Sequence, residues 1–391
     1  MRKTKTIKAH SLTGRITFKK MKKAFLKVKR NKGKAGIDGV NIRMFEQNLN
    51  ENLAALMKDI KTGKYYPCPL KRVYIPKNGG GQRPLGIPIV RDRIAQEVIR
   101  EIINPIFAPH FHHNSFGFIE GKNCHQAIEA ALSLHKQGFK FVVDADISKF
   151  FDNIPHDIIM NALTEKIADG NILRTIERFL KAGVMEQGIR KPTNIGTPQG
   201  GVISPLLANI VLNKMDWFLD KLGYQFIRYA DDFIILTKSK HQAEEALIKI
   251  SAFINNNLRL KLNQEKTNIS SFHKGYSFLG FNIRHTGCSM RQKSVENLKN
   301  KIRNITVRHL NLDKDVITSI NRVLIGTVNY FVTNFSKCKT QLGKIDYWIR
   351  MRIRCMKFKR KSYRDNYRLT NKHIRNLGLI AMTDLANSRL S

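Results

Sequence analysis

The sequence has few cysteines and no long apolar run. Its five cysteines, among 391 residues, are scattered, odd in number and without a Cys-x-x-Cys pair, so neither a zinc ribbon nor a disulfide framework is supported. No stretch approaches the roughly 18 consecutive apolar residues of a membrane helix, and the basic N-terminus is not followed by the apolar core of a signal peptide. We therefore expect a soluble protein in the cytoplasm of a bacterial cell, with no membrane partner.

Acidic residues are scarce. The chain has 30 Asp and Glu against 69 Lys and Arg, a formal net charge of +39. Solubility rarely needs a charge beyond about 2–8 in a small domain, so this surplus indicates a polyanionic partner, most simply nucleic acid. The 42% of hydrophobic residues is normal for a globular protein, and the length allows two or three domains.

The most informative stretch is Tyr229-Ala230-Asp231-Asp232. Beta-prone runs at 225–228 and 233–236 flank it, which predicts a hairpin with adjacent carboxylates at its turn. A third acid, Asp146, ends an apolar strand-like run 85 residues before Asp231. If the two strands are neighbours, these acids converge into a cluster of hard oxygen ligands that suits Mg²⁺ and two-metal displacement at phosphorus. Taken alone, an Asp-Asp pair is also typical of a solvated turn.

Basic and glycine-rich segments precede this stretch. Residues 18–28 have a helical apolar pattern and predict a docked basic helix, and Lys32 and Lys34 lie in a Gly/Lys-rich segment that is either a contact for a sugar-phosphate strand or an ordinary turn. Strands are predicted at 71–76 and 84–90, joined by a glycine-rich loop with Lys77 and Arg83 at its ends. These two cations could close over a triphosphate, although the P-loop pattern is absent and the alternative is a solvated hairpin.

The following region, 91–108, predicts a helix. We expect Arg91, Asp92 and Arg93 to form local ion pairs there rather than bind a ligand. His112 and His113 are expected in a loop, without further metal ligands at useful spacing.

Several separate motifs occur in one order along the chain. They are Asp-Ile-x-x-Phe-Phe-Asp (146–152), Gln-Gly-Gly-x-Ile-Ser-Pro (199–205), Tyr-Ala-Asp-Asp (229–232), Lys-Thr (266–267) and Phe-Leu-Gly-Phe (278–281). This set resembles the palm of reverse transcriptases, most closely those encoded by group II introns, over roughly residues 20–360. Retron-type enzymes share Tyr-Ala-Asp-Asp but have a different pattern after Gln-Gly. Residues 83–88 resemble the fingers of the same family, and residues 35–39 its N-terminal extension motif.

The resemblance implies an α+β fold with right-hand polymerase architecture. Fingers and N-terminal extension are expected in 1–140, a palm with an antiparallel sheet flanked by helices in 141–290, and a helical thumb or maturase domain in 291–391. It also implies the site: Asp146, Asp231 and Asp232, with Ile147, as metal contacts for two Mg²⁺ or substituting Mn²⁺ ions. Substrate contacts are implied for Ile147, for Lys77 and Arg83 at the triphosphate, for Phe151 at the sugar 2′ position, for Gln199 in the nucleotide pocket, and for Lys266 as proton donor to pyrophosphate. For Lys266 an exposed salt bridge is the alternative.

The last hundred residues are strongly basic. Residues 291–391 contain 23 Lys or Arg and 6 Asp or Glu, and apolar residues at helical spacing predict a bundle of three helices with basic outer faces. Residues 326–331 and 346–350 resemble the maturase domain, except that Thr327 stands where the family has Trp. The run 350–361 holds seven cations in twelve residues, so we expect RNA contacts at Arg352, Lys357, Lys359 and Arg360, the alternative being a solvated helix face.

The leading hypothesis is an RNA-directed DNA polymerase that acts on an RNA template and primer with deoxynucleoside triphosphates. By the resemblance it would also bind a structured intron RNA as a splicing maturase. Two alternatives remain: a freestanding enzyme in host repair or phage defence, and an RNA-binding splicing cofactor without polymerase activity. Longer relatives append a DNA-binding segment and a nuclease that this sequence ends without, so cleavage of a target strand is not expected. The oligomeric state is left open, a monomer included.

Overall fold

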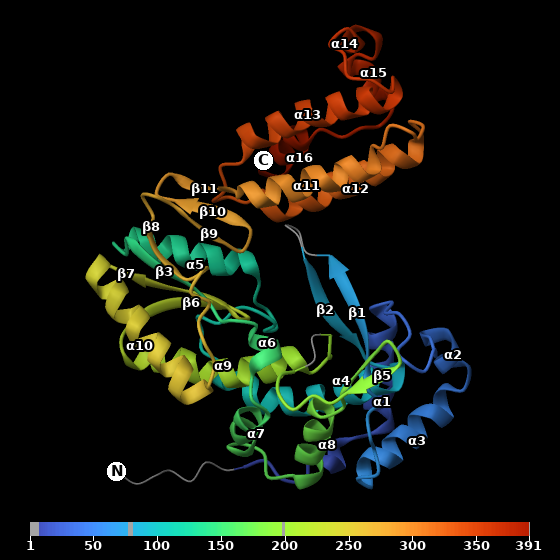
Figure 1. Ribbon diagram of the computed structural model, residues 1–391, viewed down its shortest axis with the longest axis vertical. Coiled ribbons are helices and arrows are strands. Elements are labelled where there is room, and N and C mark those ends of the chain that lie inside the picture. The colour runs from blue at the N-terminus through green and yellow to red at the C-terminus, as the bar shows by residue number, and fades with distance from the viewer. Residues whose placement is uncertain (1–7, 77–80, 198–199, 391) are drawn as a thin grey trace. The chain divides into compact units, whose positions relative to one another are not determined.

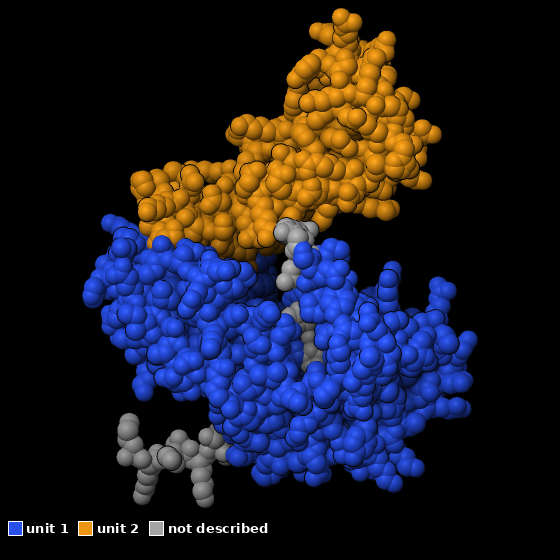
Figure 2. Space-filling model, viewed as in Figure 1, with its two compact units in different colours: residues 1–269 blue, residues 270–391 orange. Residues whose placement is uncertain are grey.

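The computed structural model describes residues 8–76, 81–197 and 200–390, and the chain divides into two compact units, 1–269 and 270–391 (Figure 2). The first unit mixes helices and strands (Figure 1). Its elements are η1 (Thr13–Arg15), α1 (Phe18–Arg30), α2 (Ile42–Gln47), α3 (Leu49–Lys61), β1 (Leu70–Pro76), β2 (Gln82–Ile87), α4 (Val90–Phe107), η2 (Ala108–His110), α5 (Cys124–Lys136), β3 (Phe141–Asp146), α6 (Phe150–Asn153), α7 (His156–Thr164), α8 (Gly170–Leu180), β4 (Val184–Glu186), β5 (Ile189–Lys191), α9 (Ser204–Lys221), β6 (Gln225–Tyr229), β7 (Asp232–Thr237), α10 (Lys240–Leu258) and, at the division, β8 (Asn268–Ser271).

The predicted basic helix near the N-terminus is α1. The Thr17 hydroxyl accepts a hydrogen bond from the Lys20 amide and caps it, and apolar residues at helical spacing, Met21, Ala24, Phe25 and Val28, are buried. The helix packs against α4, where Lys27 pairs with Glu97 at 2.7 Å. Burial of one face and pairing of the other explain why so basic a segment folds.

Two sheets position the candidate site. In the first, the strand order is β2-β1-β4-β5; β1 pairs antiparallel with β2, and β1 pairs parallel with β4. The second sheet has the order β6-β7-β3-β8, with β7 antiparallel to both β6 and β3. Strand β2 ends earlier than predicted, because Pro88 follows it and α4 begins at Val90. The α+β class is confirmed.

The two faces of the second sheet differ in what covers them. Val143 and Ala145 face Ile235 and Phe233 across the β3–β7 ladder, and all four belong to the main core with residues of α9 and α10. Because side chains alternate along a strand, Val142 and its partner Leu236 lie on the other face, where α5 packs against β6. Asp146 and Asp232 share this second face by register, so neither points into the main core.

The local ion pairs predicted within α4 are not formed. Arg91 instead pairs with Asp59 at 2.5 Å, and buried Asp92 accepts hydrogen bonds from the Tyr65 hydroxyl and the Cys68 amide. Arg93 donates to the carbonyls of residues 88 and 34. The prediction was wrong because consecutive helix residues point in different directions and do not face each other. Burial raises the pKa of Asp92 to about 6, since it disfavours the ionised carboxylate.

The second unit combines a small sheet with helices. Its elements are β9 (Tyr276–Phe278), β10 (Phe281–Arg284), β11 (Gly287–Met290), α11 (Gln292–Ile305), α12 (Lys314–Phe331), α13 (Lys339–Lys357), α14 (Asp365–Arg368), α15 (Asn371–Asn376) and α16 (Met382–Leu390). The three predicted helices are α11, α12 and α13, and most of the apolar positions that predicted them are buried. Buried Asp346 accepts hydrogen bonds from the amides of Met382 and Thr383, which fixes the start of α16. Among the described helices, none is both long and apolar enough to span a membrane.

Candidate active site

Three acidic residues lie together at one end of the second sheet. Asp146, the last residue of β3, is the register partner of Asp232, the first residue of β7. Tyr229 of β6 pairs with Asp232, so Ala230 and Asp231 form the two-residue turn between these strands. Ala230 has φ +58°, in the left-handed region that two-residue hairpin turns use. The structure thus brings together residues that are 85 positions apart in the sequence.

The segment after α10 brings Lys266 to these acids. Its backbone runs beside the end of β3: the Asn263 amide donates to the Asp146 carbonyl at 2.7 Å, and the Ser148 amide donates to the Lys261 carbonyl at 2.8 Å. From this position, Lys266 Nζ lies 2.9 Å from Asp146 Oδ2. The hydrogen bond to Asp146 raises the pKa of the Lys266 ammonium, and the charges of Asp232 and Asp231 act in the same direction. The pairing therefore further favours the protonated form of Lys266.

The environment of Asp231 disfavours its ionised form. Burial raises the pKa of Asp231, and the negative charge of Asp146 adds to the effect, while Arg83 and Lys266 oppose it. Asp146 is more open, with a side chain 24% exposed, and Asp232 is exposed. The cluster carries like charges that a cation would stabilise.

Carboxylate oxygens are the ligands that Mg²⁺ prefers, so the residue types at this strand end fit a hard divalent cation. Among the described residues, however, no three His, Cys, Asp or Glu side chains form a ready-made metal cluster. In this structure the Lys266 ammonium supplies the positive charge next to the Asp146 carboxylate. The observation that favours a cation here is the strand register, which sets Asp146 opposite Asp232 with Asp231 in the adjoining turn.

A cavity of about 440 Å³ opens beside the acids. Asp146, Asp231, Arg83 and Lys266 line it, together with Ile147, Lys149, Phe150, Phe151, Asp152, Gln82 and Pro84. Arg83 is opposite residue 75 in the β1–β2 ladder, close to the end of the described part of this hairpin. A volume in the range of about 300–1,000 Å³ is typical of small-molecule sites.

The adjacent residues Phe150 and Phe151 differ in burial. Phe150 is 1% exposed and belongs to the main core, whereas Phe151 is half-buried and packs edge-on against it with ring centroids 5.3 Å apart. Phe151 thereby presents a supported ring to the cavity. Ile147 is 2% exposed, so any contact it makes with a ligand has to come from its main chain.

Two predicted site residues, Lys77 and Gln199, lie outside the described residues, and their roles stay predictions from the resemblance. The residues that follow Gln199, from Gly200 onward, pack against the first sheet. A Cβ built on Gly200 would lie 2.2 Å from the carbonyl oxygen of Gly86, so only glycine fits there. The Val202 amide donates to Gln96 Oε1 of α4 at 2.7 Å.

The buried side chain of Arg228 stabilises the Tyr229–Asp232 turn by hydrogen bonds. Arg228 is 0% exposed; its Nε and Nη2 donate to Asp216 of α9 at 2.7 and 2.5 Å, and its Nη1 donates to Asn209 Oδ1 and to the Ala230 carbonyl, both at 2.9 Å. Asn209 also donates to the carbonyl of Gly117, where an added Cβ would lie 2.3 Å from the Ala230 nitrogen. The turn that carries Asp231 is thus fixed by α9 on one side and by the Gly117 segment on the other.

This network was missed in the sequence. The available signal was a single charge, Arg228, inside an otherwise apolar strand, together with Asp216 on the apolar side of a helix. A charge in such a place needs a partner, because burying it alone is costly. Lys149 was also missed; it has φ +45° and lines the cavity as an exposed cation.

The residues predicted to bind RNA are scattered. Lys32 and Lys34 are exposed in the first unit. In the second, Arg352 donates to the hydroxyl and carbonyl of Thr306, Lys359 donates to the Leu310 carbonyl, and Arg360 pairs with buried Asp365 at 3.0 Å. Lys357 is exposed at the end of α13. Thr327, where the family has Trp, bonds the Val323 carbonyl of its own helix.

The chain matches two known families. Residues 75–283 match the family described as "Reverse transcriptase (RNA-dependent DNA polymerase)", which includes all three acids, and residues 295–375 match "Group II intron, maturase-specific domain". The chain belongs to the reverse transcriptase and maturase family of group II introns. The predicted family is confirmed, and with it the reverse transcriptase fold.

Individual relatives are similar over part of this group II intron family protein. Protein YkfC of Escherichia coli (strain K12) is 34% identical over 286 residues, which cover 63% of this chain and 75% of that protein. Group II intron-encoded protein LtrA of Lactococcus lactis subsp. cremoris is 32% identical over 299 residues, covering 60% of this chain and 50% of LtrA. Among solved structures, Candida albicans telomerase in complex with a fragment of telomeric RNA aligns over 81% of this chain and 64% of that chain, at 14% identity and a TM-score of 0.45.

Proposed function

We propose that this protein is an RNA-directed DNA polymerase that extends a primer on an RNA template. The observation that carries the proposal is the register of β3 and β7, which sets Asp146 opposite Asp232 with Asp231 in the adjoining turn. Family membership supports the same activity. In this proposal, residues 1–140 act as extension and fingers, 141–290 as palm and 291–391 as thumb.

Asp146, Asp231 and Asp232, with the main chain of Ile147, would hold two Mg²⁺ ions, or Mn²⁺ as a substitute. When bound, such ions acidify the primer 3′-hydroxyl and neutralise the leaving pyrophosphate. Clustered carboxylates explain the choice of a divalent cation, because like charges at facing strand ends need compensation.

The remaining residues of the cavity would bind and orient the incoming deoxynucleoside triphosphate. Arg83 would contact its phosphates as a bidentate donor. The Phe151 ring, supported by Phe150, would crowd the sugar 2′ position. Lys266 would protonate the departing pyrophosphate; its hydrogen bond to Asp146 holds the ammonium beside the cavity. Lys77 at the triphosphate and Gln199 in the nucleotide pocket are included only because the family resemblance implies them.

The test is primer extension on a primed RNA by a variant with Asp231→Ala and Asp232→Ala. We expect loss of DNA synthesis, because the carboxylates that compensate the metal charge are gone. A matched control is Asp157→Ala, which removes an exposed acid of α7 that pairs with Arg259. DNA synthesis by the double variant at the rate of the control would refute the assignment of these acids as the active site, and no DNA synthesis by the unmodified chain would refute the proposed activity.

A second role, as a splicing maturase, is favoured by the maturase-domain match and by the balance of 23 cations to 6 acids in residues 291–391. In that role the chain would bind a structured intron RNA without chemistry of its own. The variant that lacks Asp231 and Asp232 should then retain RNA binding and splicing assistance. Loss of both activities together would leave no separate maturase role.

The two alternative functions predict different results in the primer-extension and splicing assays. A freestanding enzyme of host repair or phage defence would extend primers without any effect on splicing. A splicing cofactor with an idle polymerase site would assist splicing while the unmodified chain makes no DNA. The acid cluster argues against the idle site, because an unused site has no reason to keep three carboxylates that repel one another.

A further inference from the structure

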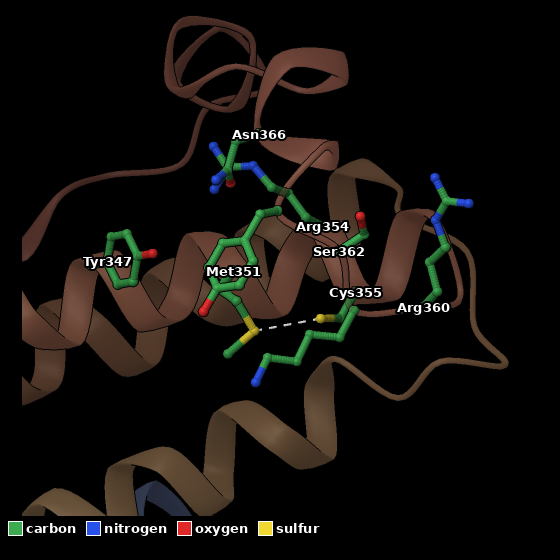
Figure 3. Close-up of a pocket in the computed structure, with 9 residues that line it drawn as sticks. Tyr347, Met351, Arg354, Cys355, Arg360, Ser362 and Asn366 are labelled. Carbon is green, nitrogen blue, oxygen red and sulfur yellow. Dashed lines mark hydrogen bonds between the residues drawn. The ribbon is translucent and has the colours of Figure 1, made fainter.

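The second unit contains a pocket that the polymerase reaction does not use. It lies between α13 and the 360–366 segment, has a volume of about 190 Å³, and is lined by Tyr347, Met351, Arg354, Cys355, Arg360, Lys361, Ser362, Tyr363 and Asn366 (Figure 3). Pockets for drug-sized ligands measure about 300–1,000 Å³, so this one suits a single flat ring system.

One face of α13 forms the apolar floor of the pocket. Tyr347, Met351, Arg354 and Cys355 are spaced by three to four residues, which places them on one side of the helix. The Met351 and Cys355 sulfur atoms lie 3.4 Å apart and present a soft, polarisable surface (Figure 3). A flat aromatic ligand packs well on such a surface.

Exposed tyrosines stand at the rim. Tyr347 is 56% exposed and Tyr363 is 77% exposed, and neither makes a hydrogen bond or a ring contact within the described residues. Exposed aromatic rings on a basic surface are the means by which proteins stack unpaired bases. Two tyrosines at the entrance of an aromatic-sized pocket therefore point to a nucleobase rather than to an aliphatic ligand.

A buried arginine supplies a donor inside the pocket. Arg354 is 6% exposed; its Nε donates to the Leu369 carbonyl at 2.9 Å and its Nη2 donates to Asn371 Oδ1 at 2.8 Å. Arg354 lines the pocket, and its Nη1 makes no hydrogen bond among the described residues. An arginine in a pocket wall with one nitrogen outside these two hydrogen bonds is suited to donate to the acceptor edge of a base.

The charge around the pocket suits a phosphate backbone. Residues 347–371 contain nine Lys or Arg and one acid, Asp365, which pairs with Arg360. Lys361 lines the pocket itself. We propose that this pocket binds one unpaired base of a bulge or loop in RNA, stacked against Tyr347 and Tyr363 with its acceptor edge toward Arg354. This inference rests on the proposed binding of structured RNA and specifies where and how one nucleotide is recognised.

The experiment compares two RNA hairpins of equal length whose stems are closed by a non-nucleotide linker, one fully paired and one with a single bulged 2-aminopurine, by affinity for the full chain and by fluorescence. We expect the bulged hairpin to bind more tightly and its fluorescence to fall on stacking. Tyr363→Ala and Tyr347→Ala should each weaken its binding about 5- to 150-fold, the equivalent of about 1–3 kcal/mol per stacked base, and leave the paired hairpin unchanged.

Tyr367→Ala is the matched control, because Tyr367 is 87% exposed, belongs to α14 and does not line the pocket. All three tyrosines are exposed, so their removal should not prevent folding. Equal affinity of the unmodified chain for both hairpins, or equal effects of all three substitutions, would overturn the inference while the proposed RNA binding stands. Binding of neither hairpin would remove the proposed RNA binding together with it.

Discussion

At the residue scale, the surroundings of Asp231 lower the stability of the fold. Its pKa is raised by burial first and by Asp146 second. A carboxyl group whose folded-state pKa is raised stabilises the fold below its unfolded-state pKa, near 3.9, and this contribution is lost as the pH rises through the folded-state value. Above the unfolded-state pKa, therefore, the environment of Asp231 lowers the stability of the fold, and a bound cation would offset this cost.

We predict that Asp231→Asn raises the free energy of unfolding at pH 7 and that its advantage over the unmodified chain disappears below about pH 4. Addition of Mg²⁺ should stabilise the unmodified chain, by about 2.7 kcal/mol at 100 times the dissociation constant, and stabilise the variant much less. Denaturant titrations with and without Mg²⁺, at several pH values, measure both effects. A variant less stable than the unmodified chain at pH 7 would contradict the assignment.

Phe151 gives a second prediction at this scale. Replacement of its ring by the methyl group of alanine should admit the 2′-hydroxyl, so the preference for deoxynucleotides in kcat/KM should fall roughly 10- to 200-fold. Phe151→Tyr keeps the ring and serves as the control, with little change in preference. If the Phe151→Ala variant still excludes ribonucleotides, another residue must exclude the 2′-hydroxyl of the sugar.

At the scale of elements, the buried Arg228–Asp216 pair ties strand β6 to helix α9 and so positions the turn. Arg228→Met should lower the free energy of unfolding by about 3–5 kcal/mol, because it leaves Asp216 buried without its partner. Adding Asp216→Leu should restore much of that stability, since an apolar pair can replace a buried ion pair.

Measurements of kcat in these variants show whether the Arg228–Asp216 pair positions the Tyr229–Asp232 turn for catalysis or only stabilises the fold. The double variant still lacks the hydrogen bonds from residue 228 to Asn209 and to the Ala230 carbonyl. We therefore expect kcat to stay about 10- to 100-fold low at saturating substrate, as for a misplaced catalytic group. Recovery of kcat along with stability would mean that the pair only supports the fold.

Local patterns in the sequence predicted the elements of the site well. The apolar run ending at Asp146 is β3, and the two runs around residues 229–232 are β6 and β7. Partners of charged side chains could not be predicted in this way, because they depend on which elements meet. Arg352 and Arg360, for example, belong to a run that we predict to contact RNA, and the sequence does not indicate their contacts with Thr306 and Asp365 in the fold.

At the scale of the whole molecule, a net charge of +39 should make binding of RNA strongly dependent on salt. If six to ten phosphates are contacted, affinity falls about 10³- to 10⁵-fold between roughly 50 and 200 mM salt. Lys357→Ala, at an exposed position, should lower the slope of log K against log salt by about one. The control is Lys249→Ala, whose ammonium pairs with Glu245. Equal slopes for both variants would remove Lys357 from the RNA interface.

The contact between Gly117 and the turn at Ala230 has a consequence for laboratory evolution of this protein. Any side chain at position 117 would push into the backbone nitrogen of residue 230, and the left-handed conformation of that residue disfavours β-branched replacements. Libraries that seek altered fidelity or speed near these acids should therefore keep Gly117 constant and offer only unbranched residues at position 230.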